Sequence, residues 1–299
     1  MSENHLTLEA LRKMPLPMPE EGGKEQRGTL LVLGGSAELP GAILLAGTAA
    51  LRVGAGRLRI ATAESIAVAT AVALPEARVI GLRQTSEGQI DPTEAARLPA
   101  LAKRCDALLI GPGLSPGAAT DALVLSLLSD GPLAPCVLDA GALSGLGAHA
   151  ETMRSCGGRG VITPHAGEMA QLLEMEREAV EADPRAAAVR AAELLGCVVI
   201  MKGARSWIVD PAGAHWLYGG GGVGLATSGS GDVLSGIIGG LLARGVEAMT
   251  AALWGVYLHG QAGRRLAARV GPLGFLAREL PGEVPALLHE AATAPLASA

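Results

Sequence analysis

The sequence predicts an α/β protein with a largely parallel central sheet that is covered by helices on both faces. Short apolar runs alternate with longer segments rich in Ala and Leu, and most of these runs are apolar on both faces. Of the 299 residues, 49% are hydrophobic, although only one Phe, two Tyr and three Trp are present. Strands that are apolar on both sides are typical of a parallel sheet buried between helices, and an aliphatic core suits that layering.

Six apolar runs are predicted to be strands of this sheet. The segments that separate most of them are long enough to be crossover helices. The runs begin at Thr29 ("TLLVLGG"), Arg57 ("RLRIAT"), Ala107 ("ALLIGPG"), Cys136 ("CVLDAG"), Gly160 ("GVITP") and Cys197 ("CVVIMKG"). A different pattern, "WIVD" followed by "PAG" and "HWLYGG", predicts a hairpin from Trp207 to Tyr218.

Helical patterns complete the layers. One helix is expected to begin near Pro40, and two long helices are expected over residues 231–243 and 247–268, where they would cover the sheet. No repeat or long linker divides the chain. We therefore expect a single domain over residues 1–299, with a loosely ordered arm through about Gly23 and a tail from about residue 291.

Charge and targeting patterns argue against several partners. The formal net charge of −5 gives no general electrostatic reason to bind nucleic acid or an anionic membrane. The N-terminus lacks the pattern of a signal peptide, and no apolar stretch reaches the length of a membrane span, so a cytoplasmic protein is expected. The four cysteines form no C-x-x-C pair and are expected to be buried small hydrophobes.

A glycine-rich turn, "SGSGDVLSG", begins the helix expected over residues 231–243. Gly229, Ser230 and Gly231 can expose their amides there, and the helix dipole favours an anion. Asp232 lies in the first helical turn. An acid at this position is commonly a capping or dipole-stabilising residue, whereas beside a transferring phosphoryl group it would accept or orient the proton of the incoming hydroxyl.

Further motifs follow predicted strands, at the edge where an open α/β sheet binds ligands. "MKGARS" places Lys202 there, and together with the anion-binding turn it favours a site for nucleotide phosphates. "ITPHAGEMAQLL" places His165 and Glu168 between a strand and a helix. His165 is suited to hydrogen-bond a substrate, with a structural role as the alternative, and Glu168 is suited to cap the helix. "IGPGL" permits the close approach of a ligand, with a plain turn as the alternative.

Motifs of other catalytic classes are missing. The stretch that begins at Val32 and includes Gly34, Gly35 and Gly41 lacks the G-x-G-x-x-G spacing of a dinucleotide fingerprint, and the sequence lacks the P-loop pattern. It also lacks the H-E-x-x-H zinc motif and the EF-hand pattern. Metalloenzyme chemistry is therefore not a leading hypothesis.

Five motifs in order, "GGSAELPGA", "IGPGL", "ITPHAGE", "MKGARS" and "GLATSGSGDVLSGII", resemble those of the ADP- or ATP-dependent NAD(P)H-hydrate dehydratases, members of the ribokinase-like superfamily. The resemblance spans residues 24–268. It implies a three-layer α/β/α fold and a hydro-lyase that repairs damaged cofactor. The S epimer of NADHX or NADPHX would be phosphorylated on its C6 hydroxyl and would then lose phosphate to give NAD(P)H. ADP, giving AMP and phosphate, is the expected co-substrate, with ATP as the alternative.

The resemblance also implies a role for each matching residue. Asp232 would be the base for the C6 hydroxyl, and the amides of Gly229, Ser230 and Gly231 would stabilise the transferring phosphoryl group. The residues expected to contact the AMP portion are Lys202, Gly203, Ala204, Arg205, Ser206 and Gly231. Those expected to contact the hydrate are Ala42, Gly113, His165 and Asp232. Mg²⁺ is expected with the nucleotide, held mostly by phosphates and water, so no protein ligand to it is assigned.

This sequence departs from the family pattern in two places. Many members read G-N-P-G where residues 221–224 read "GGVG", and D-A-D where residues 139–141 read "DAG". Asn4 is the only Asn of the chain, so an Asn contact near Gly222 has been lost rather than moved. Both departures bear on substrate binding and on the role of Asp139.

The family resemblance also implies partners for the protein, and two alternative functions remain open. The resemblance implies a homo-oligomer, with a tetramer expected, and a separate NAD(P)H-hydrate epimerase chain where an epimerase is used. A small-molecule kinase of the same fold, acting on a thiazole or pyrimidine alcohol, would use the same Asp232 and release a stable phosphate ester. A module that senses ADP or ATP without turnover is the second alternative, although binding alone needs no acid beside the phosphoryl group.

Overall fold

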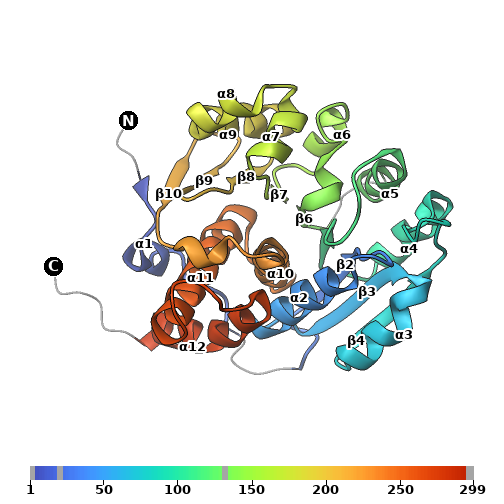
Figure 1. Cartoon of the computed structure of the whole chain (residues 1–299), viewed down its shortest axis with the longest axis horizontal. Helices are drawn as coiled ribbons and strands as arrows, with labels where there is room; N and C mark the ends of the chain where they lie inside the picture. The colour runs from blue at the N-terminus through green and yellow to red at the C-terminus, as the bar shows by residue number, and fades with distance from the viewer. Residues whose placement is uncertain (1–3, 19–22, 130–133, 294–299) are drawn as a thin grey trace.

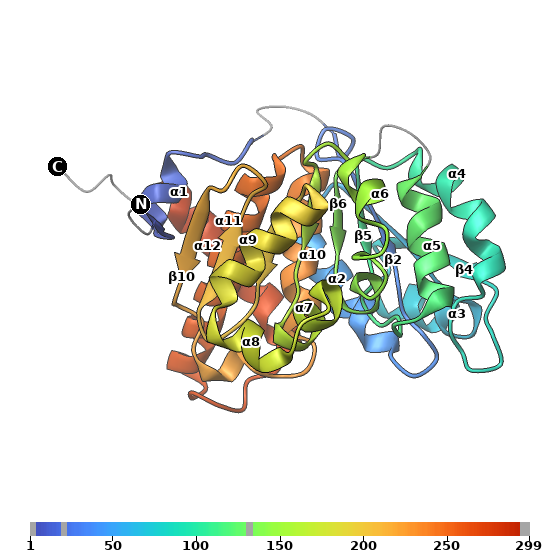
Figure 2. The same ribbon diagram turned by 90° about the horizontal axis from the view of Figure 1, so that it is seen from above.

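The computed structural model of the chain describes residues 4–18, 23–129 and 134–293. Its strands form one sheet in the order β1-β10-β9-β8-β7-β6-β5-β2-β3-β4 (Figures 1 and 2). The strands are β1 (Asn4–His5), β2 (Thr29–Leu33), β3 (Arg57–Ala63), β4 (Ala77–Leu82), β5 (Ala107–Ile110), β6 (Cys136–Leu138), β7 (Gly160–Ile162), β8 (Val198–Met201), β9 (Ser206–Val209) and β10 (His215–Tyr218).

The sheet is largely parallel, as predicted. All neighbouring pairs from β8 to β4 run parallel, and only β9 among the described strands is antiparallel to its neighbours. The predicted hairpin is confirmed, because Ser206 of β9 pairs with Tyr218 of β10. The six predicted strands are all present. The edge strand β4 was not predicted, because it is only partly buried and carries an exposed Arg78.

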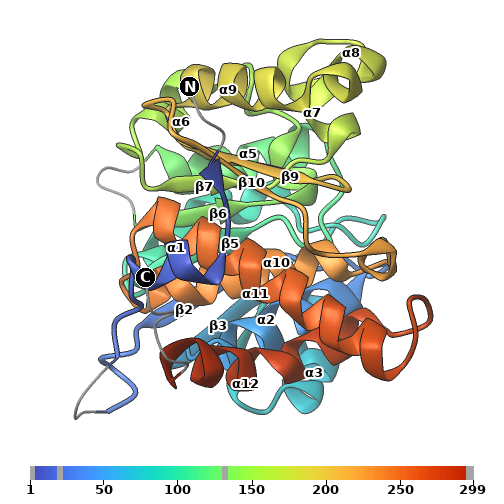
Figure 3. The ribbon, with the colours of Figure 1, turned by 90° about the vertical axis from the view of Figure 1, so that its left-hand side faces the viewer.

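Helices cover both faces of the sheet (Figure 3). The helices α2, α3, α10 and α11 lie on one face, with α1 and α12 packed outside them, and α4 to α9 lie on the other. The helices are α1 (Leu8–Arg12), α2 (Pro40–Arg52), α3 (Glu64–Ala73), α4 (Leu98–Ala102), α5 (Ala118–Leu128), α6 (Ala150–Arg154), α7 (Ala166–Leu173), α8 (Arg177–Ala182), α9 (Pro184–Leu195), α10 (Ser230–Ala243), α11 (Ala248–Arg269) and α12 (Leu280–Thr293). The three predicted helices correspond to α2, α10 and α11.

The helix α10 is buried along most of its length between the sheet, α2 and α11. Its glycines make the close packing possible. A Cβ on Gly236 would lie 2.2 Å from the carbonyl oxygen of Ala46 in α2, and a Cβ on Gly240 would lie 2.5 Å from Cγ1 of Val53. Since no side chain can occupy those positions, the two helices approach backbone to backbone, and the N-terminus of α10 is held at the carboxyl edge of the sheet.

The strand order reverses between β2 and β5. Moving along the chain, β2, β3 and β4 extend the sheet in one direction, whereas β5, β6, β7 and β8 extend it in the other. In open α/β sheets, ligands bind outside the carboxyl ends of the strands at such a reversal. The loops after β2 and β5 touch there, because the amide of Gly35 donates to the carbonyl oxygen of Pro112 at 2.8 Å.

Part of the segment expected to be a loose N-terminal arm packs against the body. β1 pairs with β10, Leu11 of α1 is fully buried, and the indole nitrogen of Trp254 donates to the carbonyl oxygen of Met14. The expected tail begins inside α12, and its residues 294–299 lie outside the described residues. Among the described residues, no helix combines the length and apolarity that crossing a membrane requires.

Candidate active site

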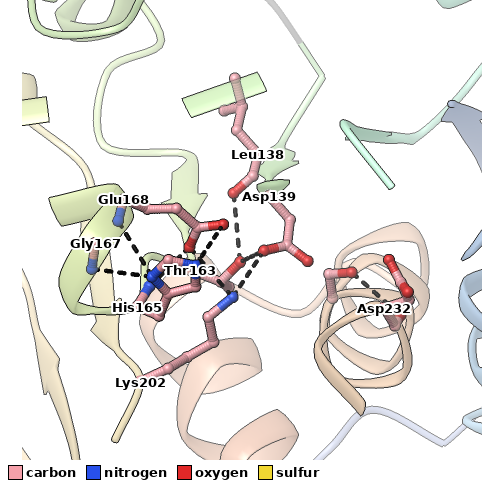
Figure 4. A network of polar contacts seen from close by, with 9 residues as sticks. Leu138, Asp139, Thr163, His165, Gly167, Glu168, Lys202 and Asp232 are labelled. Carbon is pink, nitrogen blue, oxygen red and sulfur yellow. Dashed lines mark hydrogen bonds and ion pairs between the residues drawn. The ribbon is translucent and has the colours of Figure 1, made fainter. Parts of the chain in front are cut away.

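Side chains that follow β6, β7 and β8 meet at the carboxyl edge of the sheet (Figure 4). Asp139 follows β6 directly and is 2% exposed. Its Oδ1 accepts a hydrogen bond from Oγ1 of Thr163 at 2.7 Å and another from Nζ of Lys202, which follows β8, at 3.0 Å. The parallel strands therefore bring together three polar residues that are up to 63 positions apart in the chain.

The helix α7 adds a second carboxylate to this cluster. Oε2 of Glu168 lies 3.6 Å from Nζ of Lys202 and accepts the amide hydrogen of His165 at 2.7 Å. Burial alone would lower the pKa of Lys202, but Asp139 and Glu168 outweigh it and the pKa is raised. Lys202 therefore remains a cation beside two carboxylates.

His165 caps the N-terminus of α7. Its Nδ1 accepts hydrogen bonds from the amides of Gly167 at 3.0 Å and Glu168 at 3.2 Å, which completes a capping box with Glu168. A neutral imidazole that accepts at Nδ1 carries its proton at Nε2. The side chain is 60% exposed, and its Nε2 lies 3.5 Å from Oε1 of Glu168, so a ligand that approached Nε2–H would share it with that carboxylate while Nδ1 serves the helix. Both roles weighed for His165 in the sequence are thus compatible.

Asp232 lies in the first turn of α10, beside the cluster that holds Asp139 and Lys202 (Figure 4). Its carboxylate accepts no hydrogen bond from the described residues. Burial raises the pKa of Asp232 to about 7, the negative charge of Asp139 adds to the increase, and the positive charge of Lys202 opposes it. A carboxyl group with this pKa exchanges its proton near neutral pH.

The turn that begins α10 has the geometry of an anion site. Gly229 adopts the left-handed conformation, with φ of 87°. The amides of Gly231 and Asp232 have no acceptor within the described part of the chain, whereas the amide of Ser230 donates to the carbonyl oxygen of Thr227 at 3.2 Å. Unpaired amides at the N-terminus of a buried helix favour a phosphate group.

Lys202 and the α10 turn share one small space. A Cβ built on Gly231 would lie 3.6 Å from Nζ of Lys202 and 3.9 Å from Oδ2 of Asp139. Residues 203–205 are exposed in the tight turn between β8 and β9, where Ser206 begins β9. Of the predicted nucleotide-binding residues after β8, Lys202 therefore adjoins the predicted catalytic turn.

The predicted substrate residues Ala42 and Gly113 also lie side by side. A Cβ on Gly113 would be 3.1 Å from Cβ of Ala42, at the strand-order reversal between β2 and β5. One turn further along α2, Leu45 packs against the α10 turn, because its Cδ1 would be 2.4 Å from a Cβ on Gly229. The structure thus gathers the predicted residues along one continuous edge.

The two departures from the family pattern have different surroundings. A Cβ on Gly141 would lie 2.3 Å from the carbonyl oxygen of Leu114, so the loop after β5 fills the space that a side chain would need. Gly222 has φ of 78° and open space around the position of a Cβ. Glycine at 141 is therefore required by packing, whereas glycine at 222 leaves room beside the loop.

Sequence reasoning missed two polar residues of this region. Thr163 holds Asp139, and its position at the end of a predicted strand in "ITPHAGE" was a usable signal. His259 lies in the middle of α11, with Nε2 2.9 Å from Oγ of Ser230. Nothing in the helical pattern around His259 marks it, because only the packing of α11 against α10 brings it to the turn.

The fold and the site define a ribokinase-like protein in which an anion-binding turn carries a carboxylate of raised pKa. A model of the NAD(P)H-hydrate dehydratase family matches residues 30–286. The chain is 51% identical over 284 residues to the ADP-dependent (S)-NAD(P)H-hydrate dehydratase of Xanthomonas campestris, and the match covers 95% of each. The chain belongs to the NAD(P)H-hydrate dehydratase family.

Two further relatives extend the comparison. The ADP/ATP-dependent NAD(P)H-hydrate dehydratase of Bacillus subtilis, co-crystallised with ATP and Mg²⁺, superimposes with a TM-score of 0.82 at 30% identity, covering 97% of this chain and 99% of that one. The bifunctional NAD(P)H-hydrate repair enzyme Nnr of Moorella thermoacetica is 38% identical over 275 residues. That match covers 92% of this chain and 52% of the bifunctional enzyme. The chain therefore corresponds to about half of that longer protein.

Proposed function

We propose that the chain is an ADP-dependent hydro-lyase that converts the S epimer of NAD(P)H hydrate to NAD(P)H, AMP and phosphate. Family membership and the 51% identity to an ADP-dependent dehydratase support the substrate and the nucleotide. The observation that carries the chemistry is Asp232, a carboxylate with a pKa of about 7 at an anion-binding turn. ATP is the alternative phosphoryl donor, in keeping with the ATP/Mg²⁺ complex of the Bacillus subtilis relative.

In this proposal Asp232 activates the C6 hydroxyl of the hydrate. The ionised carboxylate accepts the hydroxyl proton as the oxygen forms a bond to the terminal phosphorus of ADP, and AMP leaves. Ala42, Gly113 and His165 would hold the hydrated ring, with Nε2–H of His165 as the donor. A base whose pKa lies near neutral pH is suited to this step, because it is both ionised in sufficient amount and able to hold a proton.

The α10 turn and Lys202 would bind the phosphates. The amides of Gly229, Gly231 and Asp232 would lie where charge develops on the transferring group, and Lys202 would add a fixed positive charge. The amide of Ser230, which the sequence predicted for the same role, instead donates to the carbonyl oxygen of Thr227. Magnesium would accompany the nucleotide, held by phosphate oxygens and water, and would neutralise part of the phosphate charge. Asp139 and Glu168 pair with Lys202 at 3.0 Å and 3.6 Å, which suits them to position that cation.

Phosphorylation makes the second step possible. Hydroxide is a poor leaving group, whereas phosphate leaves readily when the ring nitrogen donates its electron pair. Phosphate departs from C6 and a proton departs from C5, which restores the dihydronicotinamide ring. Water must be kept from the phosphoryl group during transfer, and the buried setting of Asp139 and Ser230 favours that exclusion.

The bifunctional relative also supports a proposal about partners. We propose an NAD(P)H-hydrate epimerase, which would supply the S epimer, as a functional partner of this chain. A homo-oligomer is the assembly that we propose, supported by the apolar surface of α3, where Val68 is 77% and Val72 is 78% exposed. Light scattering of the purified protein measures that assembly.

A direct assay tests the proposed function. The protein is incubated with NADHX, Mg²⁺ and either ADP or ATP, NADH is followed by its absorbance, and AMP, ADP and phosphate are quantified. We expect one NADH and one phosphate per nucleotide consumed, with ADP the better donor. A phosphorylated product without NADH would instead indicate a kinase, and nucleotide binding without any turnover would indicate a sensing module. Either outcome would overturn the proposal.

A further inference from the structure

The first residue of α10 makes a side-chain hydrogen bond that the proposed mechanism does not use. Oγ of Ser230 lies 2.9 Å from Nε2 of His259, and Ser230 is 5% exposed. His259 is located in the middle of α11, which packs against α10. The anion-binding turn is thus contacted by His259 from α11 and approached by Lys202 from the end of β8.

His259 is uncharged at neutral pH. Burial lowers the pKa of His259 to about 4, the contact with Ser230 opposes this change, and the positive charge of Lys202 adds to it. A neutral imidazole has one N–H donor and one acceptor nitrogen. His259 therefore supplies no net charge to a phosphate, but it can fix the direction of a neighbouring hydroxyl.

We propose that His259 is a positioning residue that directs the hydroxyl of Ser230 at the phosphoryl group transferred at the N-terminus of α10. The inference rests on the proposed function. Because the amide of Ser230 donates to Thr227, the hydroxyl is the donor that Ser230 retains for a ligand. The residue thus contributes through its side chain at a turn where Gly231 and Asp232 contribute through their amides.

The chemistry of the phosphoryl group selects one tautomer of His259. A phosphoryl oxygen accepts hydrogen bonds and donates none, so Ser230 donates its single hydroxyl proton to it. The bond between Ser230 and His259 is then donated by Nε2–H of His259. Two hydrogen bonds run in the same direction, from His259 through Ser230 to the phosphoryl oxygen, and each polarises the next.

Single substitutions test whether the donor at His259 matters. His259→Leu removes the donor at similar volume, and we expect kcat to fall on the order of tenfold while KM for ADP changes less than about threefold, because an oriented donor acts mainly on the transition state. His259→Gln can place an amide N–H close to the same point and should restore most of kcat. An unchanged kcat in His259→Leu, or equal losses in the Leu and Gln variants, would overturn the inference.

A double-mutant cycle tests whether His259 acts through Ser230. In a Ser230→Ala background, His259→Leu should lower kcat no further, since the hydroxyl that His259 directs is already gone. Fully additive losses would assign His259 a general packing role. The matched control is Gln261→Leu on the same helix as His259, which removes a hydrogen bond from Nε2 of Gln261 to the hydroxyl of Tyr218 in β10. This control should leave kcat unchanged.

A measurement without turnover separates this inference from the proposed function. The ring nitrogens of His259 are observed by ¹⁵N NMR with and without ADP, and His259→Gln assigns the resonances. With ADP bound we expect the Nε2–H tautomer. The Nδ1–H tautomer would overturn the inference even if the wild-type protein forms NADH, whereas absence of NADH formation by wild type would overturn the proposed function alone.

Discussion

The charged residues at the carboxyl ends of the parallel strands (the carboxyl edge) and those at the amino ends (the amino edge) are held in different ways. At the carboxyl edge, Asp139, Lys202 and Asp232 lie near one another, and the Asp232 carboxylate has no hydrogen-bond donor among the described residues. At the amino edge, the charged groups are bonded to backbone. Asp106 accepts from the amide of Thr29 at 2.7 Å, and Nη1 of Arg244 donates to the carbonyl oxygen of Val53 at 2.8 Å.

A cavity at the amino ends of the strands is lined by charged side chains that are bonded within the protein. This cavity has a volume of about 660 Å³ and is lined by Asp106, Arg159 and Arg244 among others. Its charged side chains already have protein partners, as when Nε of Arg159 donates to the carbonyl oxygen of Cys156 at 3.0 Å. The carboxyl edge instead keeps unpaired amides and a carboxylate of raised pKa. These unsatisfied polar groups are the reason why we propose the site at the carboxyl edge rather than at the cavity.

The largest expected effect is the loss of the base at the carboxyl edge. Asp232→Asn should lower kcat on the order of a hundredfold or more, because the amide cannot accept the hydroxyl proton. The same substitution at the amino edge, Asp106→Asn, should leave kcat within about twofold and cost on the order of 1 kcal/mol of stability through its weakened bond to Thr29. Steady-state kinetics and chemical denaturation of both variants measure the contrast. Similar kcat losses in the two variants would contradict the assignment of the base to the carboxyl edge.

A smaller effect is expected from filling the phosphate space. In Gly231→Ala the added methyl meets Lys202 and Asp139 only at van der Waals distance, so the melting temperature should not change. The methyl occupies the space in front of Lys202, and KM for ADP should rise on the order of tenfold. Gly282→Ala, in an open position of α12, is the matched control and should leave KM unaltered. An unchanged KM in Gly231→Ala would place the nucleotide elsewhere.

The smallest effect is a shift in the pH dependence. Because Asp232 must be ionised to act and its pKa is about 7, kcat/KM should rise with pH and level off above that value. Asp139 raises this pKa, so Asp139→Asn should move the rise to lower pH, whereas Asp106→Asn should leave it in place. A pH–rate profile of each variant measures the shift. Movement to higher pH in Asp139→Asn would contradict the electrostatic account.

The raised pKa of Asp232 also predicts that the stability of the folded protein falls as pH rises, whereas kcat/KM rises. The pKa of Asp232 in the folded state exceeds the ordinary value of 3.8. The protonated group therefore contributes fully to the stability of the folded state below pH 3.8, and this contribution is lost as pH rises to about 7. Asp232→Asn should therefore gain stability relative to wild type as pH increases through this window. Denaturation curves at several pH values measure this difference, and a constant difference would show that the pKa is not shifted.

Regular elements with a strong local pattern were predictable from the sequence. The six buried strands and the helices α2, α10 and α11 combine apolar periodicity with glycine or proline at their ends. β1 was not predictable, because this two-residue strand pairs with β10 more than 200 residues later in the chain. The docking of α1 likewise depends on α11 and α12, so the local sequence indicated only a loose arm.

The sequence by itself determined the class of fold and the residue types of the site, since apolar periodicity and glycine-rich turns act over a few neighbouring residues. It indicated Asp232, Lys202 and His165 as polar residues at strand or helix ends. Only the tertiary structure decided how these groups act on one another. The pairing of Lys202 with Asp139, the raised pKa of Asp232 and the contact of His259 with Ser230 all depend on distances across the sheet and between packed helices. Electrostatic interactions follow such distances and the surrounding burial, which no local pattern encodes.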